Sequence, residues 1–347
     1  KIITERTFNL NKPPLLTKHI NKKKFERFID KERYGLLVLP RYKNQLSRSV
    51  VDVVDLSNFE TIHTYKHDIN EVLNKIQNHK IFPKDHHRMA PERFYYGHPI
   101  LLEDGSLISY GPLFKIDFCS KLEWINDKQQ FHHSIELDHE KNIWIGGNQI
   151  PETKYVNQYK LKKFNDDSIV KLNSDGKILY EKSVLEILIE NKILPDNYAL
   201  SSDLVERKSR ITDPVHLNDI EPAFYDTDYW KKGDLFISSR ALNSIIHYRP
   251  SINKVINYIT GPFAQQHDPD IISPKEISIF NNNNFSENNK YSEILIYNFE
   301  TKKFKKMFND ELIKDNFKTI TQGVSHILGD GSLIVEEQNH GRLILYN

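Results

Sequence analysis

The stretch SIVKLNSDGKILYE, residues 168–181, decides the fold. Apolar and polar residues alternate on both sides of its polar turn, a pattern typical of a β-hairpin. The same pattern recurs along the chain as VVDVVDLSNFETIHTY (50–65), LFKIDFCSKLEWI (113–125), SIIHYRPSINKVINY (244–258), EILIYNFETKKFKKM (293–307) and the shorter RLILYN (342–347). Hairpins that recur at intervals of roughly fifty residues indicate the blades of a propeller.

A second set of strands precedes most of these hairpins. Its members are HPILLEDGSLISYG (98–111), HSIELDHEKNIWIGG (133–147), KGDLFISSR (232–240), HDPDIISPKEISIF (267–280) and HILGDGSLIVEE (326–337). Two strand pairs make one four-stranded blade. We therefore predict an all-β fold, a six-bladed β-propeller that occupies residues 1–347 as a single domain. Residues near Thr7–Leu10 are expected to close the last blade.

Insertions interrupt the repeat. Residues 67–80 and 183–193 carry apolar residues at helical spacing and predict two short helices at the edges or faces of blades. The run NNNNFSENN, residues 281–289, predicts a solvated loop between two strands of one blade.

Composition excludes several classes of protein. With 48 Lys and Arg against 47 Asp and Glu, the net charge is +1, so the chain has no overall field that would attract nucleic acid. The single cysteine, Cys119, excludes an internal disulfide framework. No apolar run approaches the length needed to cross a bilayer, and no signal peptide is visible. Any specificity for an anion must therefore be local.

Histidines recur at one phase of the repeat. They stand just before the first strand of a blade, at His98, His133, His216, His267 and His326. The first strand of each propeller blade lines the central channel, so residues at one phase converge on one mouth of that channel. Histidines out of this phase, among them His67 and His247, are expected on the solvated surface.

Hydrogen-bond donors accompany the histidines. Asn218 lies two residues after His216 and faces the same side of an extended strand, and Arg240 ends the strand GDLFISSR. Histidine, asparagine and arginine, with few acidic residues beside them, predict a pocket for a small oxyanion. Sulfate and phosphate monoesters have this chemistry.

These segments resemble the arylsulfotransferase family, the PAPS-independent bacterial aryl-sulfate sulfotransferases. The resemblance runs from about residue 90 to the end and rests on the ordered motifs HHS, HLN, SSR and QHD, within FHHSIELDHEKNIWIGG, DPVHLNDIEP, GDLFISSRALNSIIHY and GPFAQQHDPDI. It implies a six-bladed propeller that transfers a sulfuryl group from a phenolic sulfate ester to a hydroxyl acceptor such as a phenol. It also implies ping-pong kinetics through a sulfohistidine, without a nucleotide cofactor.

The resemblance also implies a role for each motif. His267 of QHD corresponds to the nucleophile, and His133 of HHS to a further channel histidine. His216, Asn218 and Arg240 correspond to the residues that hold the sulfuryl oxygens. His132 is expected to point away from the site, because adjacent residues of a strand face opposite ways. Aromatic residues available to wall a phenol pocket are Phe94, Tyr95, Tyr96, Phe131 and Phe263.

Two other interpretations of the pocket stay open. A non-catalytic propeller could bind a ligand or a protein on its face. Alternatively, several channel histidines could ligate zinc or copper, although no HExxH pattern occurs and Arg240 would oppose a dication. The resemblance itself implies no metal, no cofactor and no nucleic-acid partner. It implies a periplasmic or membrane-anchored location outside the cytoplasm, as for bacterial members of the family.

Overall fold

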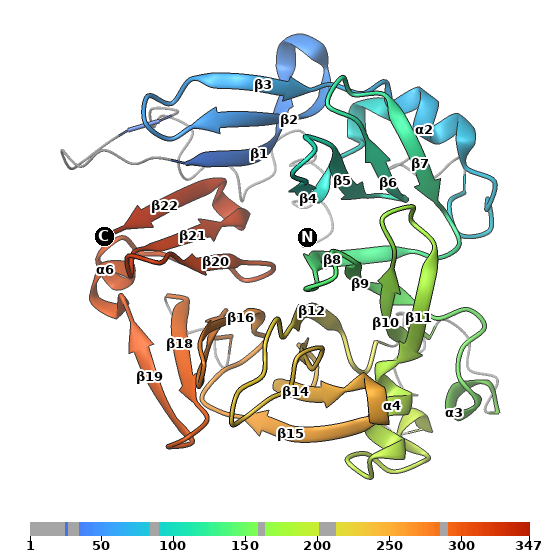
Figure 1. The fold of residues 1–347 in the computed structure, drawn as a ribbon, viewed down its shortest axis with the longest axis vertical. Coiled ribbons are helices and arrows are strands. Elements are labelled where there is room, and N and C mark those ends of the chain that lie inside the picture. Colours follow the sequence, from blue (N-terminus) through green and yellow to red (C-terminus); the bar gives the residue numbers. More distant parts are fainter. Residues whose placement is uncertain (1–24, 27–34, 84–89, 159–163, 201–212, 285–290) are drawn as a thin grey trace, which may run out of the picture.

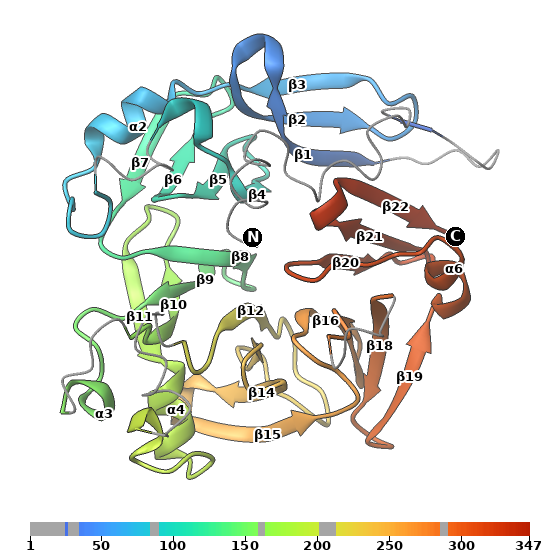
Figure 2. The same ribbon diagram turned by 180° about the vertical axis from the view of Figure 1, so that it is seen from behind.

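Six antiparallel sheets stand around one axis (Figure 1) and make a six-bladed β-propeller. The computed structural model describes residues 25–26, 35–83, 90–158, 164–200, 213–284 and 291–347. Figure 2 shows the same ring from behind. The fold class predicted from the repeated hairpins is therefore confirmed.

The strands of each blade follow one another in chain order. The first three blades contain β1 (Leu36–Lys43), β2 (Arg48–Asp55) and β3 (Thr61–Tyr65); β4 (Gly97–Leu101), β5 (Leu107–Tyr110), β6 (Leu113–Ile116) and β7 (Leu122–Asn126); and β8 (Phe131–Leu137), β9 (Ile143–Asn148), β10 (Asp167–Leu172) and β11 (Ile178–Ser183). The last three contain β12 (Leu217–Pro222), β13 (Leu235–Ser239), β14 (Ser244–Arg249) and β15 (Lys254–Thr260); β16 (His267–Ser273), β17 (Glu276–Asn281), β18 (Glu293–Asn298) and β19 (Lys303–Met307); and β20 (Val324–Ile327), β21 (Leu333–Glu337) and β22 (Arg342–Tyr346).

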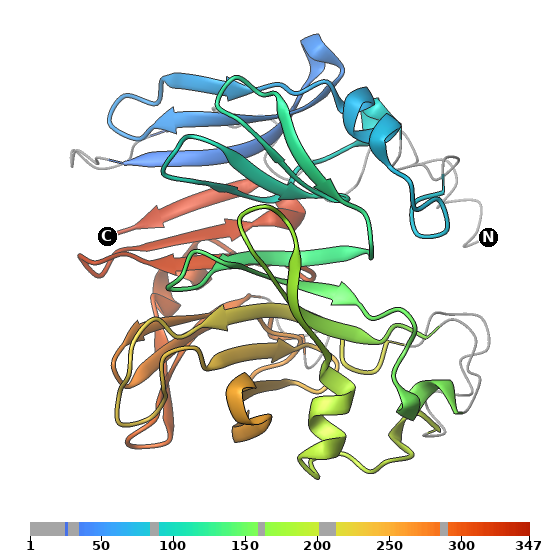
Figure 3. The ribbon, with the colours of Figure 1, turned by 45° about the vertical axis from the view of Figure 1, so that its right-hand side comes forward.

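Short helices interrupt the ring within the described residues. The α-helices are α2 (Ile69–Lys75), α3 (Lys154–Asn157), α4 (Val184–Glu190) and α6 (Asn309–Lys314). Single turns of 3-10 helix are η1 (Asn44–Leu46), η3 (Pro91–Arg93), η4 (Tyr198–Leu200), η5 (Pro250–Ile252) and η6 (Gln338–His340). Figures 1 and 3 show α2 and α4 at the periphery of the ring. No helix in the described part of the chain is long and apolar enough to span a membrane.

Both predicted helical insertions are present, and side-chain caps explain where they begin. The Asp68 carboxylate accepts a hydrogen bond from the Asn70 amide at the start of α2, with 3.1 Å between the atoms. The Ser183 hydroxyl accepts one from the Glu186 amide, also at 3.1 Å, at the start of α4. Such caps satisfy amide groups that the first turn of a helix leaves free.

The first and last blades have three strands each in the described part of the chain. Residues Thr7–Leu10, which we predicted to close the last blade, lie outside the described residues. The closure of the ring therefore stays a prediction.

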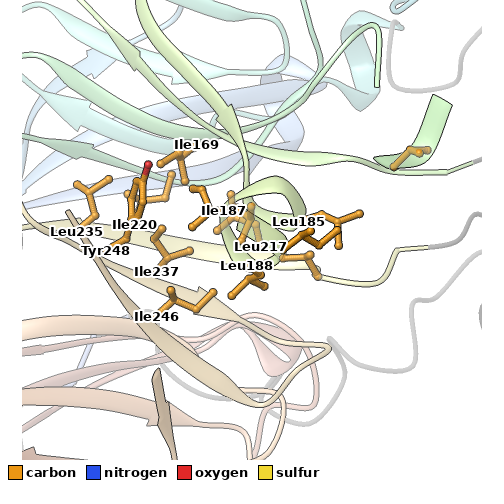
Figure 4. Close-up of a cluster of buried hydrophobic side chains, with 14 of the residues drawn as sticks. Ile169, Leu185, Ile187, Leu188, Leu217, Ile220, Leu235, Ile237, Ile246 and Tyr248 are labelled. Atoms are coloured by element: carbon orange, nitrogen blue, oxygen red, sulfur yellow. The ribbon is translucent and has the colours of Figure 1, made fainter. Parts of the chain in front are cut away.

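The hydrophobic core lies between neighbouring blades. Figure 4 shows one such cluster, in which Ile187 and Leu188 of α4 pack beside Ile237 of β13. These side chains are fully buried. Burying apolar surface at roughly 25 cal/mol per Å² makes such contacts the main force that holds adjacent blades together. The blades in turn fix the inner strands that face the channel.

Two surface predictions were wrong. Asn281 and Asn282 have no exposed surface, so the loop predicted at residues 281–289 begins inside the protein; residues 285–290 lie outside the described part. His67 and His247 are buried as well. His247 lies between the Asp234 carboxylate, at 2.8 Å, and the Asn257 amide, at 3.0 Å. Buried polar groups need such partners, and single-residue patterns do not reveal them.

Candidate active site

Four inner strands carry a β-bulge near their first residues. The pairing register shifts between Gly97 and Ile100, His132 and Ile135, Leu217 and Asp219, and His267 and Pro269. At or beside each bulge one residue adopts a left-handed backbone: His98 (φ 37°), His133 (φ 65°), His216 (φ 48°) and Asp268 (φ 49°). Such a conformation costs a residue other than glycine roughly 1–2 kcal/mol. Bulges re-aim side chains, and these bulges lie at the histidines of the predicted site.

A cavity of about 440 Å³ opens beside these bulges. Its walls include the predicted site residues His133, Asn218 and His267. The His133 ring lies 6.3 Å from the His267 ring and 5.4 Å from the His216 ring, measured between centroids. His216 itself does not line the cavity; its ring makes an edge contact with the ring of His133. Three blades thus bring their histidines to one place, as the phase argument predicted.

Arg240 and Asn218 are joined to the segment that leads into His267. The Arg240 guanidinium donates to the Gln265 side-chain oxygen at 2.9 Å. The Asn218 amide donates to the Gln266 backbone oxygen at 2.6 Å. Each residue comes from the neighbouring blade, so these bonds hold the two blades in register at the site. The five predicted site residues are thus linked in one region, but only His133, Asn218 and His267 line the cavity; Arg240, like His216, does not.

His267 is a buried and neutral imidazole. Its Nδ1 lies 2.7 Å from Asn282 Oδ1 and 3.2 Å from the Gln265 carbonyl oxygen. Within the described residues, none of its hydrogen bonds uses Nε2. Burial lowers the pKa of His267 to about 3, and the nearby Arg240 charge acts in the same direction. The Nε2 lone pair is therefore available over the whole neutral range.

His132 was expected to point away from the site, and this prediction was wrong. Both His132 and His133 line the cavity, and their Nδ1 atoms are 2.6 Å apart. The bulge and the left-handed backbone at His133 break the alternation on which the prediction rested. The two adjacent histidines of the HHS motif were the only signal in the sequence that both rings belong to the site.

The charges of these two rings differ. Burial disfavours the His132 imidazolium, but the carboxylates of Asp167 and Asp213 raise its pKa above the usual value. Burial, and then the neighbouring His132, holds the pKa of His133 well below the usual value. The imidazolium form of His132 carries a hydrogen on Nδ1 and would donate it to His133 Nδ1; the hydrogen of a neutral His133 would then be on Nε2.

Asp213 holds His216 from two sides. The Asp213 carboxylate lies 2.6 Å from His216 Nδ1 and accepts a hydrogen bond from the His216 backbone amide at 3.1 Å. A carboxylate only accepts, so Nδ1 carries a hydrogen. The role of this aspartate, in the segment DPVH, was not predicted from the sequence. An aspartate three residues before a histidine on a turn could have indicated it.

The expectation that few acidic residues lie near the site was also wrong. The inner strands carry a carboxylate layer, defined here as Glu136, Asp219, Glu221, Asp268 and Asp270. Asp219 and Asp268 line the cavity. Burial, and then the Asp270 charge, raise the pKa of Glu136 and of Asp268 to about 8. Much of this layer is therefore protonated at neutral pH, which lets it coexist with an anion.

The two remaining in-phase histidines differ in position. His98 lines the cavity, its ring stacks on Tyr110, and burial lowers its pKa to about 4. His326 does not line the cavity. Its Nδ1 lies 3.2 Å from Asp270, and this hydrogen bond raises its pKa to about 10. His326 therefore supplies a positive charge to the carboxylate layer.

Aromatic rings form part of the wall. Of the five candidates named from the sequence, Phe94, Tyr95 and Phe131 line the cavity. Tyr96 and Phe263 are buried in clusters between blades and do not line it. In the described part of the chain, no three histidine, cysteine or acidic side chains converge in a way that could hold a metal ion.

Comparison with known proteins decides the family. The arylsulfotransferase (ASST) family model matches residues 96–347, which include every bulge and every predicted site residue. The chain belongs to the arylsulfotransferase family. This membership supports a sulfotransferase-like function that acts on small sulfate and hydroxyl compounds.

Other comparisons add little beyond the fold. No curated protein matches the chain. A protein of unknown function from Bacteroides caccae has a similar structure, with a TM-score of 0.50, 9% identity, and coverage of 86% of this chain and 81% of that one. Virginiamycin B lyase from Staphylococcus aureus has a TM-score of 0.37, 13% identity, and coverage of 73% and 69%. The first likeness supports the propeller fold alone.

Proposed function

We propose that this arylsulfotransferase-family protein transfers a sulfuryl group from an aryl sulfate ester to a hydroxyl acceptor through a sulfohistidine at His267. The observation that carries the proposal is a pair of histidine rings, His133 and His267, that line one cavity with their centroids 6.3 Å apart. The acceptors at His267 Nδ1 leave its Nε2 lone pair available. We assign the hydrogen of His133 to Nε2, because a charged His132 donates to His133 Nδ1. A nucleophile and a donor on facing rings are what a two-step transfer requires.

In the first step His267 Nε2 attacks the sulfur of the ester. The N–S bond forms, the S–O bond to the phenol breaks, and its electron pair leaves with the phenol oxygen. His133 Nε2 donates a proton to that oxygen, and His132 replaces it by passing its own Nδ1 proton to His133 Nδ1. Asp167, 3.5 Å from His132 Nε2, favours the charged His132 ring before the step. Transfer of this kind is promoted chiefly by positioning and preorganised charge.

In the second step an acceptor hydroxyl attacks the sulfur of the sulfohistidine. The N–S bond breaks, its electron pair returns to His267 Nε2, the hydroxyl proton goes to His133 Nε2, and His133 returns its Nδ1 hydrogen to His132. Asn218 lines the cavity and is assigned as a donor to the sulfuryl oxygens, whereas Arg240 and His216 lie outside its lining and support the site from there, the always charged Arg240 through its positive potential. Two half-reactions through a sulfohistidine make the kinetics ping-pong, and neither half-reaction needs a nucleotide.

The wall of the cavity supports an aromatic substrate. Phe94, Tyr95 and Phe131 line the cavity beside the histidines that would hold the sulfuryl group; Tyr95 is the exposed ring of the three, whereas Phe94 and Phe131 are buried behind the lining. The donor is therefore proposed to be a phenolic sulfate, and the acceptor a phenol. By the resemblance noted above, we also place the protein outside the cytoplasm, as a periplasmic or membrane-anchored enzyme.

A chromogenic aryl sulfate tests the proposal. The purified protein should release the coloured phenol, and release should depend on an added acceptor phenol. His267→Gln should lower kcat/KM by on the order of 10³-fold or more, because it removes the atom that forms the covalent bond. His139→Gln changes a histidine outside the site and should keep the activity. A His267→Gln protein as active as the parent, or ligand binding with no ester cleavage, would favour the non-catalytic module.

A further inference from the structure

The asparagine run that begins at Asn281, the last residue of β17, starts inside the protein next to His267. Asn281 and Asn282 have no exposed surface, although asparagine is seldom buried without a reason. The mechanism above uses neither residue. Their hydrogen bonds lead to the segment that carries the proposed nucleophile.

The Asn282 amide is fixed in one orientation. Its Nδ2 donates to two backbone carbonyl oxygens, that of Thr319 at 3.1 Å and that of Gln322 at 2.6 Å. Carbonyl oxygens only accept, so a flipped amide would press Oδ1 against both of them. Asn282 Oδ1 must therefore face His267 Nδ1, 2.7 Å away.

The orientation of the amide determines the tautomer of the ring. Oδ1 only accepts, so His267 Nδ1 must carry the hydrogen. The second neighbour of Nδ1, the Gln265 carbonyl oxygen at 3.2 Å, is also an acceptor, so it too favours a hydrogen on Nδ1. A neutral imidazole has one N–H, and Nε2 is left with its lone pair.

We propose that Asn282 is a positioning residue that fixes His267 in the Nδ1–H tautomer and so presents the Nε2 lone pair to the cavity. Its effect on turnover rests on the proposed sulfuryl transfer, whereas its effect on the tautomer does not. An amide oxygen is far less basic than a carboxylate. It holds the Nδ1 proton in place without removing it, so the ring remains a good leaving group when the N–S bond breaks in the second step.

The neighbouring asparagines support the same segment. Asn281 Oδ1 accepts a hydrogen bond from the Ala264 amide at 2.9 Å. Asn284 Nδ2 donates to Gln265 Oε1 at 3.0 Å, the oxygen that also receives the Arg240 hydrogen bond. The run therefore fixes the approach to His267 as well as its ring. This arrangement explains why asparagines at a strand end are buried here.

Nitrogen NMR of the histidine rings tests the inference without any substrate. Protein labelled with ¹⁵N-histidine gives ring correlations that distinguish Nδ1–H from Nε2–H, and the signals lost in His267→Gln identify the ring. The parent should show Nδ1–H at His267. Asn282→Ala should show a mixture of the two tautomers or Nε2–H, with kcat lowered about 10- to 100-fold and a small change in KM.

A second pair in the same protein supplies the control. Asn257, which is exposed, and the buried His247 also form an asparagine–histidine contact, at 3.0 Å, on strands β15 and β14. Asn257→Ala should leave the His267 signals and the turnover unchanged. Asn282→Leu is close to asparagine in size and has no acceptor, so it should also lose Nδ1–H; it serves as the test variant if Asn282→Ala does not fold.

Two results would overturn the inference. One is an Nε2–H ring at His267 in the parent, and the other is an unchanged tautomer in folded Asn282→Ala. Sulfuryl transfer by the parent is measured separately; an unchanged tautomer in Asn282→Ala bears only on Asn282, whereas an Nε2–H ring in the parent would also count against His267 Nε2 as the attacking atom. Conversely, a protein that transfers no sulfuryl group but loses the Nδ1–H tautomer in Asn282→Ala would refute the proposed function and keep the inference.

Discussion

His267 remains neutral at pH values where an exposed imidazole would be largely protonated. Burial lowers its pKa to about 3, compared with about 6.5 for an unperturbed ring. The neutral ring is the proposed nucleophile, so acid removes activity only as the pH falls toward 3. Asp268 acts at the other end of the range. Burial raises its pKa to about 8, and ionisation above that pH places a negative charge beside an anionic ester.

We therefore predict that kcat/KM for an aryl sulfate changes little between about pH 5 and pH 7 and falls above about pH 8. Asp268→Asn cannot ionise, yet keeps an oxygen for the Ser325 amide that Asp268 now binds at 2.5 Å. This variant should lose much of the alkaline decline. The measurement is the pH profile of both proteins, with the exposed Asp226→Asn as the control. An alkaline decline as steep in Asp268→Asn as in the parent would contradict the assignment to Asp268.

At the residue scale, the sequence located the histidines and missed their partners. The phase of the repeat predicted that His133, His216 and His267 meet, because each opens or precedes an inner strand. Asn282 was assigned to a solvated loop, since its polar neighbours hide its burial. Asp213 and Asp268 were overlooked because their contacts depend on backbone turns that the letters do not encode.

The β-bulge is the structural element that builds the site. It recurs in β4, β8, β12 and β16, each time with a left-handed residue at or beside it. Hairpins and helices were predictable from apolar periodicity and turn residues. The bulges were not, because the left-handed positions carry histidine or aspartate where glycine would have been the signal.

A pair of variants at His133 tests this backbone conformation. Both His133→Gly and His133→Ala remove the imidazole, so the lost contacts are the same. At φ 65° glycine avoids the left-handed penalty that alanine retains. We predict that His133→Gly is more stable than His133→Ala by about 1 kcal/mol, as measured by urea unfolding. Equal stability, or a more stable alanine variant, would show that the residue is not left-handed.

The whole ring reconciles a nearly neutral chain with an anion site. The net charge is +1, yet three adjacent blades bring histidine and asparagine side chains to one cavity, and Arg240 is hydrogen-bonded to the segment that leads into His267. The propeller was predictable because its blade repeats along the chain. The carboxylate layer was not, because its members are spread over three strands and only the ring brings them together. The closure by residues near Thr7–Leu10 stays a prediction.

Trapping the intermediate tests the central claim most directly. The protein is incubated with an aryl sulfate and no acceptor, digested at alkaline pH, and analysed by mass spectrometry. The account predicts one added sulfuryl group on the peptide that contains His267, stable to base and labile to acid. Added phenol should discharge it. A sulfuryl group on another residue, or transfer to phenol with His267 unmodified throughout, would contradict the account.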